Sequence, residues 1–341
     1  MSSFSDCRPV FIIGAPRSGT SVLTWCIGQH SNILPLPETH WIADAALGME
    51  DLYAAGSSQG KYTHLGALDW SANDFYAAYG EAIDRLVIQT RPARRNFILK
   101  EIATRSGKSV SELEEILDKG GAGSINFAIE RSKNDPKKRW VDGTPRNTFY
   151  TFCLAQMFPN AKFIHLLRAP HDVVLSLSNF SQAGSGGTDF DLARANQTWK
   201  QHVTQSVLTE DALGPDRVIR IEFSDLIRNS EETLTQLCAV LGEEFELECL
   251  LPLKEKINSS KVKAGEGNRK PLASDENQAL FVRLTASSEL QKEVVDENEA
   301  MQRLQSQHRA LRSNSVGLSV SQKLYNKLSG RLLNWISKIT S

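Results

Sequence analysis

This chain of 341 residues lacks a long hydrophobic run. No stretch approaches the roughly 18 apolar residues that a membrane-spanning helix needs, and the first ten residues, MSSFSDCRPV, lack the basic and apolar segments of a signal peptide. An excess of charge of one sign is also missing, because the formal net charge is -1. General nucleic-acid binders are normally basic overall. We therefore expect a cytoplasmic protein with no nucleic-acid partner.

Paired cysteines and metal-binding patterns are missing too. The five cysteines show no C-x-x-C spacing, which together with the missing export signal indicates reduced thiols. The seven histidines show no paired helical spacing, and no H-E-x-x-H motif occurs. The sequence therefore predicts no metal site.

Short apolar runs alternate with helical patterns along the chain. Nearly continuous runs of β-branched and aromatic residues are typical of buried parallel strands. Such runs occupy residues 10–13, 96–100, 162–167 and 217–221. Helical patterns occupy residues 21–29, 146–157, 172–180 and 230–241. This alternation predicts an α/β fold with a doubly wound parallel sheet, flanked by helices and joined by right-handed crossovers.

The length suits one large α/β domain with additions. We place the main domain at residues 1–285, with a helical insertion at about 44–135 on the acceptor side, and a helical C-terminal tail at 286–341. Within the tail, residues 324–339 form an amphipathic pattern with basic and no acidic residues. Such a helix can lie at the periphery of an anionic membrane, dock on the domain or mediate self-association, and the sequence leaves these alternatives open.

The stretch FIIGAPRSGTSVL, residues 11–23, has the construction of a phosphate-binding loop. An apolar strand leads into a loop with Gly14 and Gly19, and a helical pattern follows; backbone N–H groups and a helix N-terminus favour an anion there. Nucleotide-hydrolysing loops, G-x-x-x-x-G-K-[ST], carry a lysine where this chain has Thr20. Arg17 is the only cation of the loop. The loop can therefore hold a phosphate, but it lacks the lysine that serves a triphosphate–magnesium complex.

The segment PRSGTS, residues 16–21, resembles the 5′-phosphosulfate loop of sulfotransferases that use 3′-phosphoadenosine-5′-phosphosulfate (PAPS). HLLRAPHDVVLSLS continues the resemblance, because the family binds the 3′-phosphate with an arginine and a serine spaced like Arg168 and Ser176. Guanidinium groups make forked, charge-assisted contacts to phosphate, which agrees with that role. The resemblance covers residues 8 to about 270 and implies a P-loop-like fold. The cofactor-binding residues that it implies are Pro16, Arg17, Ser18, Gly19, Thr20, Ser21, Arg168 and Ser176.

The chain departs from the family pattern at several positions, and its pattern is nearer to the bacterial, carbohydrate and tyrosylprotein branches. Gly143, in WVDGTPRN, stands where many relatives have a lysine that assists the departing phosphate, and Arg146 is a candidate substitute. Phe223 stands where the family has tyrosine; it can pack against the adenine but cannot donate an O–H bond. A basic segment at residues 256–270 corresponds to a part that relatives fold over the cofactor.

The resemblance implies in-line transfer of a sulfuryl group from PAPS, without a metal, to a hydroxyl of a saccharide, lipid, peptide tyrosine or small alcohol. Arg17 would then stabilise the charge on the leaving 5′-phosphate. A base must accept the acceptor proton, and Glu38, His40 and Asp142 are the candidates near the loop. Glu38 is preferred, because tyrosylprotein sulfotransferases have their base at this offset from the loop arginine, also followed by threonine. His40 is second, since cytosolic relatives use histidine.

Two other functions stay open at the level of sequence. A P-loop kinase-like phosphotransferase of the same fold class is one, although the missing lysine argues against it. A non-catalytic protein that holds a nucleotide, or a membrane surface through its tail, is the other.

Overall fold

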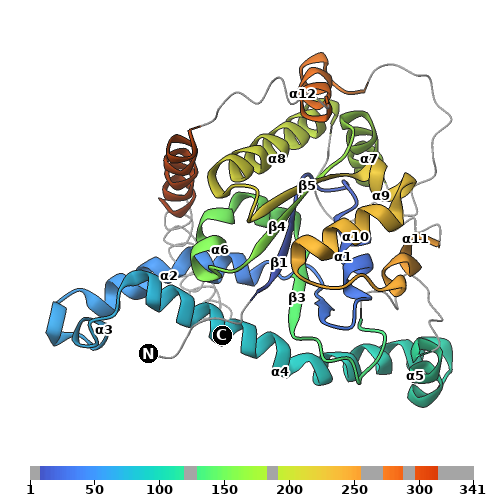
Figure 1. Ribbon diagram of the computed structural model, residues 1–341, viewed down its shortest axis with the longest axis horizontal. Coiled ribbons are helices and arrows are strands. Elements are labelled where there is room, and N and C mark those ends of the chain that lie inside the picture. Colours follow the sequence, from blue (N-terminus) through green and yellow to red (C-terminus); the bar gives the residue numbers. More distant parts are fainter. Residues whose placement is uncertain (1–7, 119–128, 183–190, 255–271, 287–295, 314–341) are drawn as a thin grey trace, which may run out of the picture.

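The computed structural model describes residues 8–118, 129–182, 191–254, 272–286 and 296–313. A five-stranded sheet lies at its centre, with the strand order β2-β3-β1-β4-β5 (Figure 1). The strands are β1 (Val10–Ile13), β2 (Ile33–Pro35), β3 (Arg139–Asp142), β4 (Lys162–Leu167) and β5 (Val218–Glu222). All neighbouring strands pair in parallel, which confirms the predicted α/β fold with a doubly wound, P-loop-like sheet.

The position of β1 in the sheet locates the expected binding crevice. β1 pairs with β3 on one side and with β4 on the other, with Phe11 level with Asp142 and Phe163. The chain thus forms β2 and β3 on one side of β1 and then crosses to the other side for β4 and β5. In open α/β sheets, ligands bind at the carboxyl ends of the strands, where the strand order reverses. The loop that follows β1 lies at this place.

Helices cover both faces of the sheet, and further helices pack on them. They include α1 (Thr20–Gly28), α6 (Thr151–Met157), α7 (Pro170–Gln182), α8 (Leu192–Leu213), α9 (Phe223–Arg228), α10 (Ser230–Leu241), α11 (Leu251–Lys254) and α12 (Asp275–Thr285). Helix α12 is one of the outer helices and packs on α7 and α8. The predicted helices at residues 21–29, 172–180 and 230–241 are thereby confirmed. The predicted helix at 146–157 is divided, because its first part is a 3₁₀ helix, η3 (Pro145–Phe149), and only the second part is α6.

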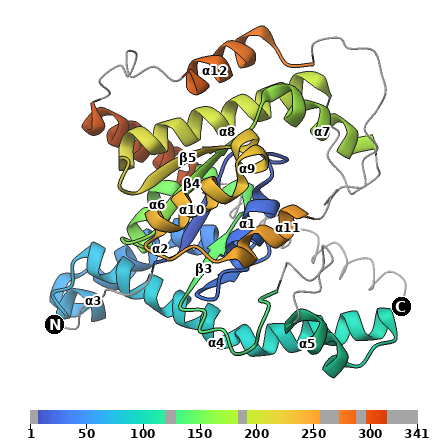
Figure 2. The same cartoon turned by 45° about the vertical axis from the view of Figure 1, so that its right-hand side comes forward.

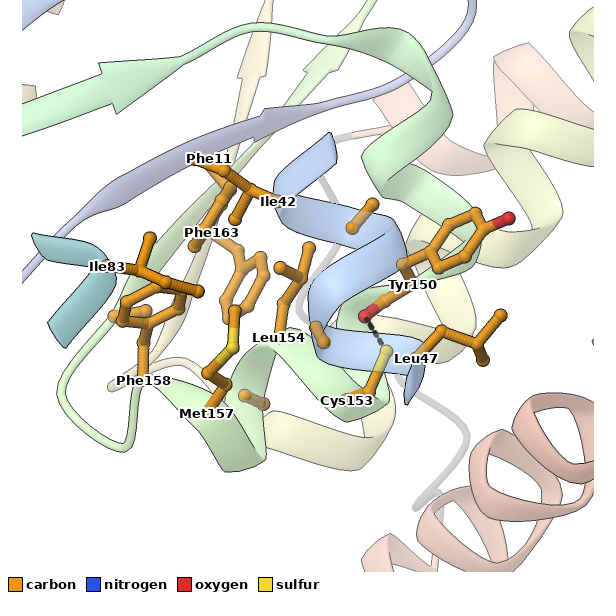
Figure 3. Close-up of a cluster of buried hydrophobic side chains, with 14 of the residues drawn as sticks. Phe11, Ile42, Leu47, Ile83, Tyr150, Cys153, Leu154, Met157, Phe158 and Phe163 are labelled. Atoms are coloured by element: carbon orange, nitrogen blue, oxygen red, sulfur yellow. Dashed lines mark hydrogen bonds between the residues drawn. The ribbon is translucent and has the colours of Figure 1, made fainter. Parts of the chain in front are cut away.

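Alternate residues of β1 point to opposite faces and enter two different hydrophobic cores. Phe11 packs against Phe163 and Trp140, with ring centroids 5.5 and 5.4 Å apart. Figure 3 shows this core, in which Phe11 and Phe163 of the sheet meet Phe158 just beyond α6. Ile12 belongs to the core on the other face, with α1 and α10. Because both faces of the sheet are covered at β1, all four residues of this strand are apolar.

The insertion between β2 and β3 is helical. It contains α2 (Trp41–Ser57), η1 (Gly60–Tyr62), α3 (His64–Ala67), α4 (Ala72–Ser106) and α5 (Val110–Asp118). In both Figure 1 and Figure 2, α4 and α12 lie at opposite ends of the molecule, with the sheet between them. These helices begin at Trp41, three residues after the candidate base, Glu38, and the assignment of an insertion at about 44–135 to the acceptor side stays a prediction.

The strand predicted at residues 96–100 is wrong, because this segment belongs to α4. Leu99 is 1% exposed whereas Phe97 is 67% exposed. Only one side of this helical segment is therefore buried, whereas a central strand of the sheet would be buried on both faces. Periodicity alone does not distinguish a short apolar run in a strand from one in a helix. The sequence reading also missed β2, which has three residues and ends in Pro35. A proline is tolerated there because β2 is an edge strand.

Part of the C-terminal tail is a helix over residues 297–313, drawn in dark red in Figure 1. Leu304 packs against Leu208 of α8, and His308 Nε2 lies 2.8 Å from the Glu50 carboxylate of α2. The boundary at residue 286 stays a prediction, and the segments at 256–270 and 324–339 lie outside the described residues. In the part of the chain that is described, no helix is both long and apolar enough to cross a bilayer.

Candidate active site

The glycine loop turns sharply between β1 and α1. Gly14, Arg17 and Gly19 have φ angles of 140°, 70° and 101°. A Cβ on Gly14 would lie 2.6 Å from the Leu166 carbonyl oxygen, and one on Gly19 would lie 2.4 Å from the Phe223 ring. Glycine is therefore required at both positions for conformation and for space. Arg17 adopts the left-handed conformation without being glycine, a strain that proteins concentrate at functional sites.

The helix that follows the loop offers an anion-binding end. Gly19 is the N-cap of α1 and supplies no side-chain cap hydrogen bond. The first N–H groups of a helix have no partner within the helix and carry partial positive charge. The hydroxyl-bearing residues of the loop differ in exposure, since Ser18 and Thr20 are buried and Ser21 is exposed. Pro16, Arg17 and Gly19 are half-buried.

The two predicted phosphate sites meet in the structure. Arg168 follows the carboxyl end of β4, and Ser176 lies in the second turn of α7. Arg17 Nε donates to Ser176 Oγ at 3.1 Å, and Arg168 Nη1 donates to the carbonyl oxygen of Arg17 at 3.1 Å. The loop and the Arg168–Ser176 pair therefore form one continuous site.

Several groups support Arg168 from the protein side. Its guanidinium carbon lies 4.5 Å from the centroid of the Phe223 ring, a cation–π contact. Its main-chain carbonyl accepts a 2.9 Å hydrogen bond from Trp199 Nε1, and Asp172 Oδ2 lies 3.7 Å from its Nε. The Phe223 ring lies between Gly19 and Arg168 and therefore holds the Arg168 side chain in place. The sequence around Phe223 did not indicate this contact.

Burial and mutual repulsion act on the two arginines of the site. Burial, and then the charge of Arg168, lower the pKa of Arg17, whereas the nearby charge of Glu38 raises it. Burial likewise lowers the pKa of Arg168, with Asp172 acting in the opposite direction. Two partly desolvated guanidinium groups beside one another are costly, and an anion between them would relieve that cost. The arrangement suits a ligand that carries more than one negative group.

The candidate bases occupy very different environments. Glu38 and His40 lie at the rim of the site, where their side chains are 55% and 54% exposed and 3.3 Å apart. Asp142 is completely buried at the end of β3, and its two oxygens accept four hydrogen bonds. An acceptor hydroxyl therefore has no access to Asp142. Glu38 and His40 stay as candidates.

The segment after β3 connects the glycine loop to this region. Thr148 Oγ1, in η3, accepts a 3.0 Å hydrogen bond from the N–H group of Gly14. Asn147, the preceding residue, donates to Asp142 at 2.9 Å. The sequence reading did not single out Thr148, whose place just beyond WVDGTPRN was the available signal. In the described parts of the chain, no three histidine, cysteine or acidic side chains are grouped to hold a metal.

Comparison with known proteins identifies the family. A sulfotransferase family model matches residues 9–247, well over half of the chain. The chain belongs to the sulfotransferase family. Similar solved structures include the sulfotransferase domain from the curacin biosynthetic pathway, with 21% identity, 88% of this chain and 97% of that chain covered, and a TM-score of 0.43. Another is the sulfotransferase domain of the Synechococcus PCC 7002 olefin synthase, with 18% identity, 88% and 95% covered, and a TM-score of 0.39.

A curated relative is much longer than this sulfotransferase-family chain. An uncharacterized protein of Aquifex aeolicus is 24% identical over 258 residues, which are 73% of this chain and 26% of that protein. The chain thus spans about a quarter of the length of the curated relative that it matches.

This member of the sulfotransferase family has no room for a side chain at position 143. A Cβ on Gly143 would lie 2.2 Å from Thr24 Oγ1 and 3.2 Å from the Thr20 carbonyl oxygen, both on α1. Arg146, the candidate substitute for the missing lysine, donates to the Asp44 carboxylate at 3.1 Å and to the Tyr150 hydroxyl at 2.6 Å. These hydrogen bonds raise the pKa of Arg146 and hold it against α2.

We expect Gly143→Ala to lower the free energy of unfolding by about 1–3 kcal/mol, because the added methyl group overpacks the contact with α1. Adding Thr24→Ala, which removes the nearest atom, should restore part of the loss. Gly48→Ala on α2 is the matched control, since its Cβ would meet nothing within 4 Å. Urea denaturation of the four proteins measures these differences. Equal stability of Gly143→Ala and Gly48→Ala would contradict the packing described here.

Proposed function

We propose that this chain transfers the sulfuryl group of PAPS to a hydroxyl oxygen of an acceptor. The contact between the two arginine sites carries the proposal: Arg17 Nε lies 3.1 Å from Ser176 Oγ, and Arg168 donates to the Arg17 carbonyl. PAPS carries a phosphosulfate at one end of its ribose and a phosphate on the 3′ oxygen. Such a ligand needs two adjacent cationic sites at one edge of the sheet, and this arrangement supplies them.

Each end of the nucleotide has its own set of groups in this proposal. The start of α1, with Thr20, Ser21 and Arg17, would hold the 5′-phosphosulfate, because helix N-termini and guanidinium groups bind phosphate oxygens. Arg168 and Ser176 would hold the 3′-phosphate. The whole family-like segment, Pro16 to Ser21, would contact the nucleotide. These residues need no metal ion to bind it.

The reaction follows from the placement of charge in the site. The acceptor oxygen attacks sulfur in line with the bond to the 5′-phosphate, the new O–S bond forms, and the old one breaks. Glu38 accepts the acceptor proton, and adenosine 3′,5′-bisphosphate (PAP) leaves with the bonding electron pair. Negative charge grows on the bridging oxygen, where Arg17 and the helix N–H groups stabilise it. The products are a sulfate ester and PAP.

The acceptor carries a hydroxyl group, with a saccharide, a lipid, a peptide tyrosine and a small alcohol as the classes to test. In this proposal the acceptor lies at the Glu38 side of the site, next to the helical insertion. Helix α2 begins at Trp41, three residues after Glu38, and Trp41 is 45% exposed, which supports this placement.

Incubation of the full chain with sulfur-labelled PAPS and pools of saccharides, lipids, peptides and small alcohols tests the proposal. We expect labelled product in one pool, together with calorimetric binding of PAP. Turnover of ATP that depends on Mg²⁺, with no binding of PAP, would instead identify a phosphotransferase. Binding of PAP without transfer to any pool would identify a non-catalytic nucleotide-binding protein.

We expect Arg168→Ala to weaken PAP binding by about 10- to 100-fold, the loss of one or two charge-assisted hydrogen bonds. Binding of 5′-AMP, which lacks the 3′-phosphate, should change much less. Arg105→Ala is the matched control, because Arg105 is an exposed arginine on α4 that pairs with Glu101. Calorimetry with PAP and AMP makes the comparison. If both nucleotides weaken equally, Arg168 does not hold the 3′-phosphate.

A further inference from the structure

Thr39, the residue after the candidate base, is held by two hydrogen bonds. Its hydroxyl donates to Asp142 Oδ2 at 2.7 Å, and its N–H group donates to Thr144 Oγ1 at 2.9 Å. The Thr144 hydroxyl donates in turn to Asp142 Oδ1 at 2.5 Å. These three bonds close a ring between two segments that lie a hundred residues apart in sequence. The N–H group of Thr39 belongs to the peptide bond with Glu38, so the ring holds the main chain of Glu38.

Asp142 makes this ring rigid. Its side chain is 0% exposed and also accepts hydrogen bonds of 2.9 Å from the Thr144 N–H group and from Asn147 Nδ2. A carboxylate with four donors forms charge-assisted hydrogen bonds, which are stronger than neutral ones. A buried network whose members have partners has few alternative arrangements. Asp142 is thus an anchor whose own oxygens are fully used.

The residue after Thr39 adopts a strained backbone conformation. His40 has φ 46° and ψ -49°, and the N–H group of Trp41 donates to the Thr39 carbonyl. Such a conformation costs a non-glycine residue about 1–3 kcal/mol and persists only where the surroundings impose it. His40 and Arg17 are two of the four non-glycine residues with positive φ in the described chain, and both lie at this site. The turn places His40 Nε2 3.3 Å from Glu38 Oε2.

We propose that Asp142, acting through Thr39, is a positioning residue that holds Glu38 at the glycine loop for proton transfer. This inference rests on the proposed function, in which Glu38 is the base. The ring lies beside the glycine loop, because a Cβ on Gly143, the neighbour of Thr144, would lie 3.2 Å from the carbonyl oxygen of Thr20 at the start of α1. The nearby charge of Glu38, which raises the pKa of Arg17, agrees with this placement. Asp142, a candidate base by sequence, is therefore assigned the role of positioning the base Glu38.

Thr39→Val tests the ring with the smallest change of shape. The variant loses the hydroxyl donor, while Asp142 Oδ2 keeps its bond to Asn147. Loss of positioning should lower kcat by about 10- to 100-fold, because displacements of the order of 1 Å cost about that much. PAP affinity should stay within a factor of about two, since no nucleotide contact is assigned to Thr39. Thr39→Ser keeps the hydroxyl and should retain most of the rate.

Thr90→Val is the matched control, because Thr90 lies on α4 and its hydroxyl only donates within that helix. Thermal melting of each variant monitors folding. If Thr39 had only a structural role, Thr39→Val would lower the melting temperature, and kcat and PAP affinity would fall together. That result would contradict the positioning role.

A double-mutant cycle with Glu38→Gln decides whether Thr39 acts through Glu38. We expect Thr39→Val to slow the wild-type chain but to change the rate of Glu38→Gln by less than about twofold, because residues that act as a unit are not additive. Rates are measured with sulfur-labelled PAPS and whichever acceptor pool the wild-type chain sulfates. Additive effects in an active enzyme would overturn the positioning inference alone. A wild-type chain that binds PAP but sulfates no pool would overturn both proposals.

Discussion

Arg17→Ala should lower the rate of sulfuryl transfer by at least about 10²- to 10³-fold, the usual loss when a preorganised donor to developing charge is removed. Arg17 is the only cation in the glycine loop, and Gly143 stands where many relatives have a lysine. Arg146, the candidate substitute for that lysine, is engaged with Asp44 and Tyr150. PAP should also bind more weakly, since the product keeps the phosphate that Arg17 would contact in the proposed function. Single-turnover rates with labelled PAPS and calorimetry with PAP measure the two effects.

The backbone of Arg17 requires a careful choice of control. Its φ of 70° disfavours alanine, so Arg17→Ala adds strain to the loss of charge. Asparagine tolerates the left-handed conformation, and Arg17→Asn therefore removes the charge with little strain. Arg17→Lys keeps the charge, and we expect it to retain part of the activity. Near-normal turnover of Arg17→Asn would contradict the role assigned to the guanidinium.

Glu38→Gln should lower kcat by about 10²- to 10⁴-fold, the contribution typical of a positioned general base. Glutamine keeps the size and hydrogen-bonding shape of the side chain but cannot accept the acceptor proton. Affinity for PAP should be unchanged or slightly higher, because the substitution removes a negative charge that acts on Arg17. Loss of turnover with intact nucleotide binding is therefore the expected signature, measured by initial rates and calorimetry.

His40→Gln is the partner experiment for Glu38→Gln. His40 Nε2 lies 3.3 Å from Glu38 Oε2, so we expect the variant to retain most of the rate if His40 only neighbours the base. A large loss in His40→Gln with little loss in Glu38→Gln would reverse the assignment and make His40 the base. An unchanged rate in both variants would move the base to another residue.

Short-range features of the chain were predictable from sequence. The loop from Gly14 to Ser21 could be recognised because a strand, two glycines and a helix start occur within a dozen residues. The spacing of Arg168 and Ser176 was visible because both lie in one strand–helix unit. Their assignment to one nucleotide followed from the resemblance to PAPS-dependent sulfotransferases, which bind the 5′-phosphosulfate and the 3′-phosphate with these two motifs. Both motifs are short enough to be visible as residue spacing along the chain.

Long-range packing decided the rest, because it depends on segments that the chain brings together only on folding. The apolar run at residues 96–100 has no local mark that separates strand from helix, and its place in α4 follows from what Leu99 packs against. Asp142 resembled a base in sequence, and only its four donors reveal a buried anchor. Phe223 became a support for Arg168 by the same process. The sequence by itself determined the glycine loop between a strand and a helix and the α/β class of the fold, since both follow from local patterns, but not β2 or the helical state of residues 96–100. Tertiary structure alone decided which charged groups face the site and which are buried and hydrogen-bonded within the protein. Their hydrogen-bond partners come from distant parts of the chain.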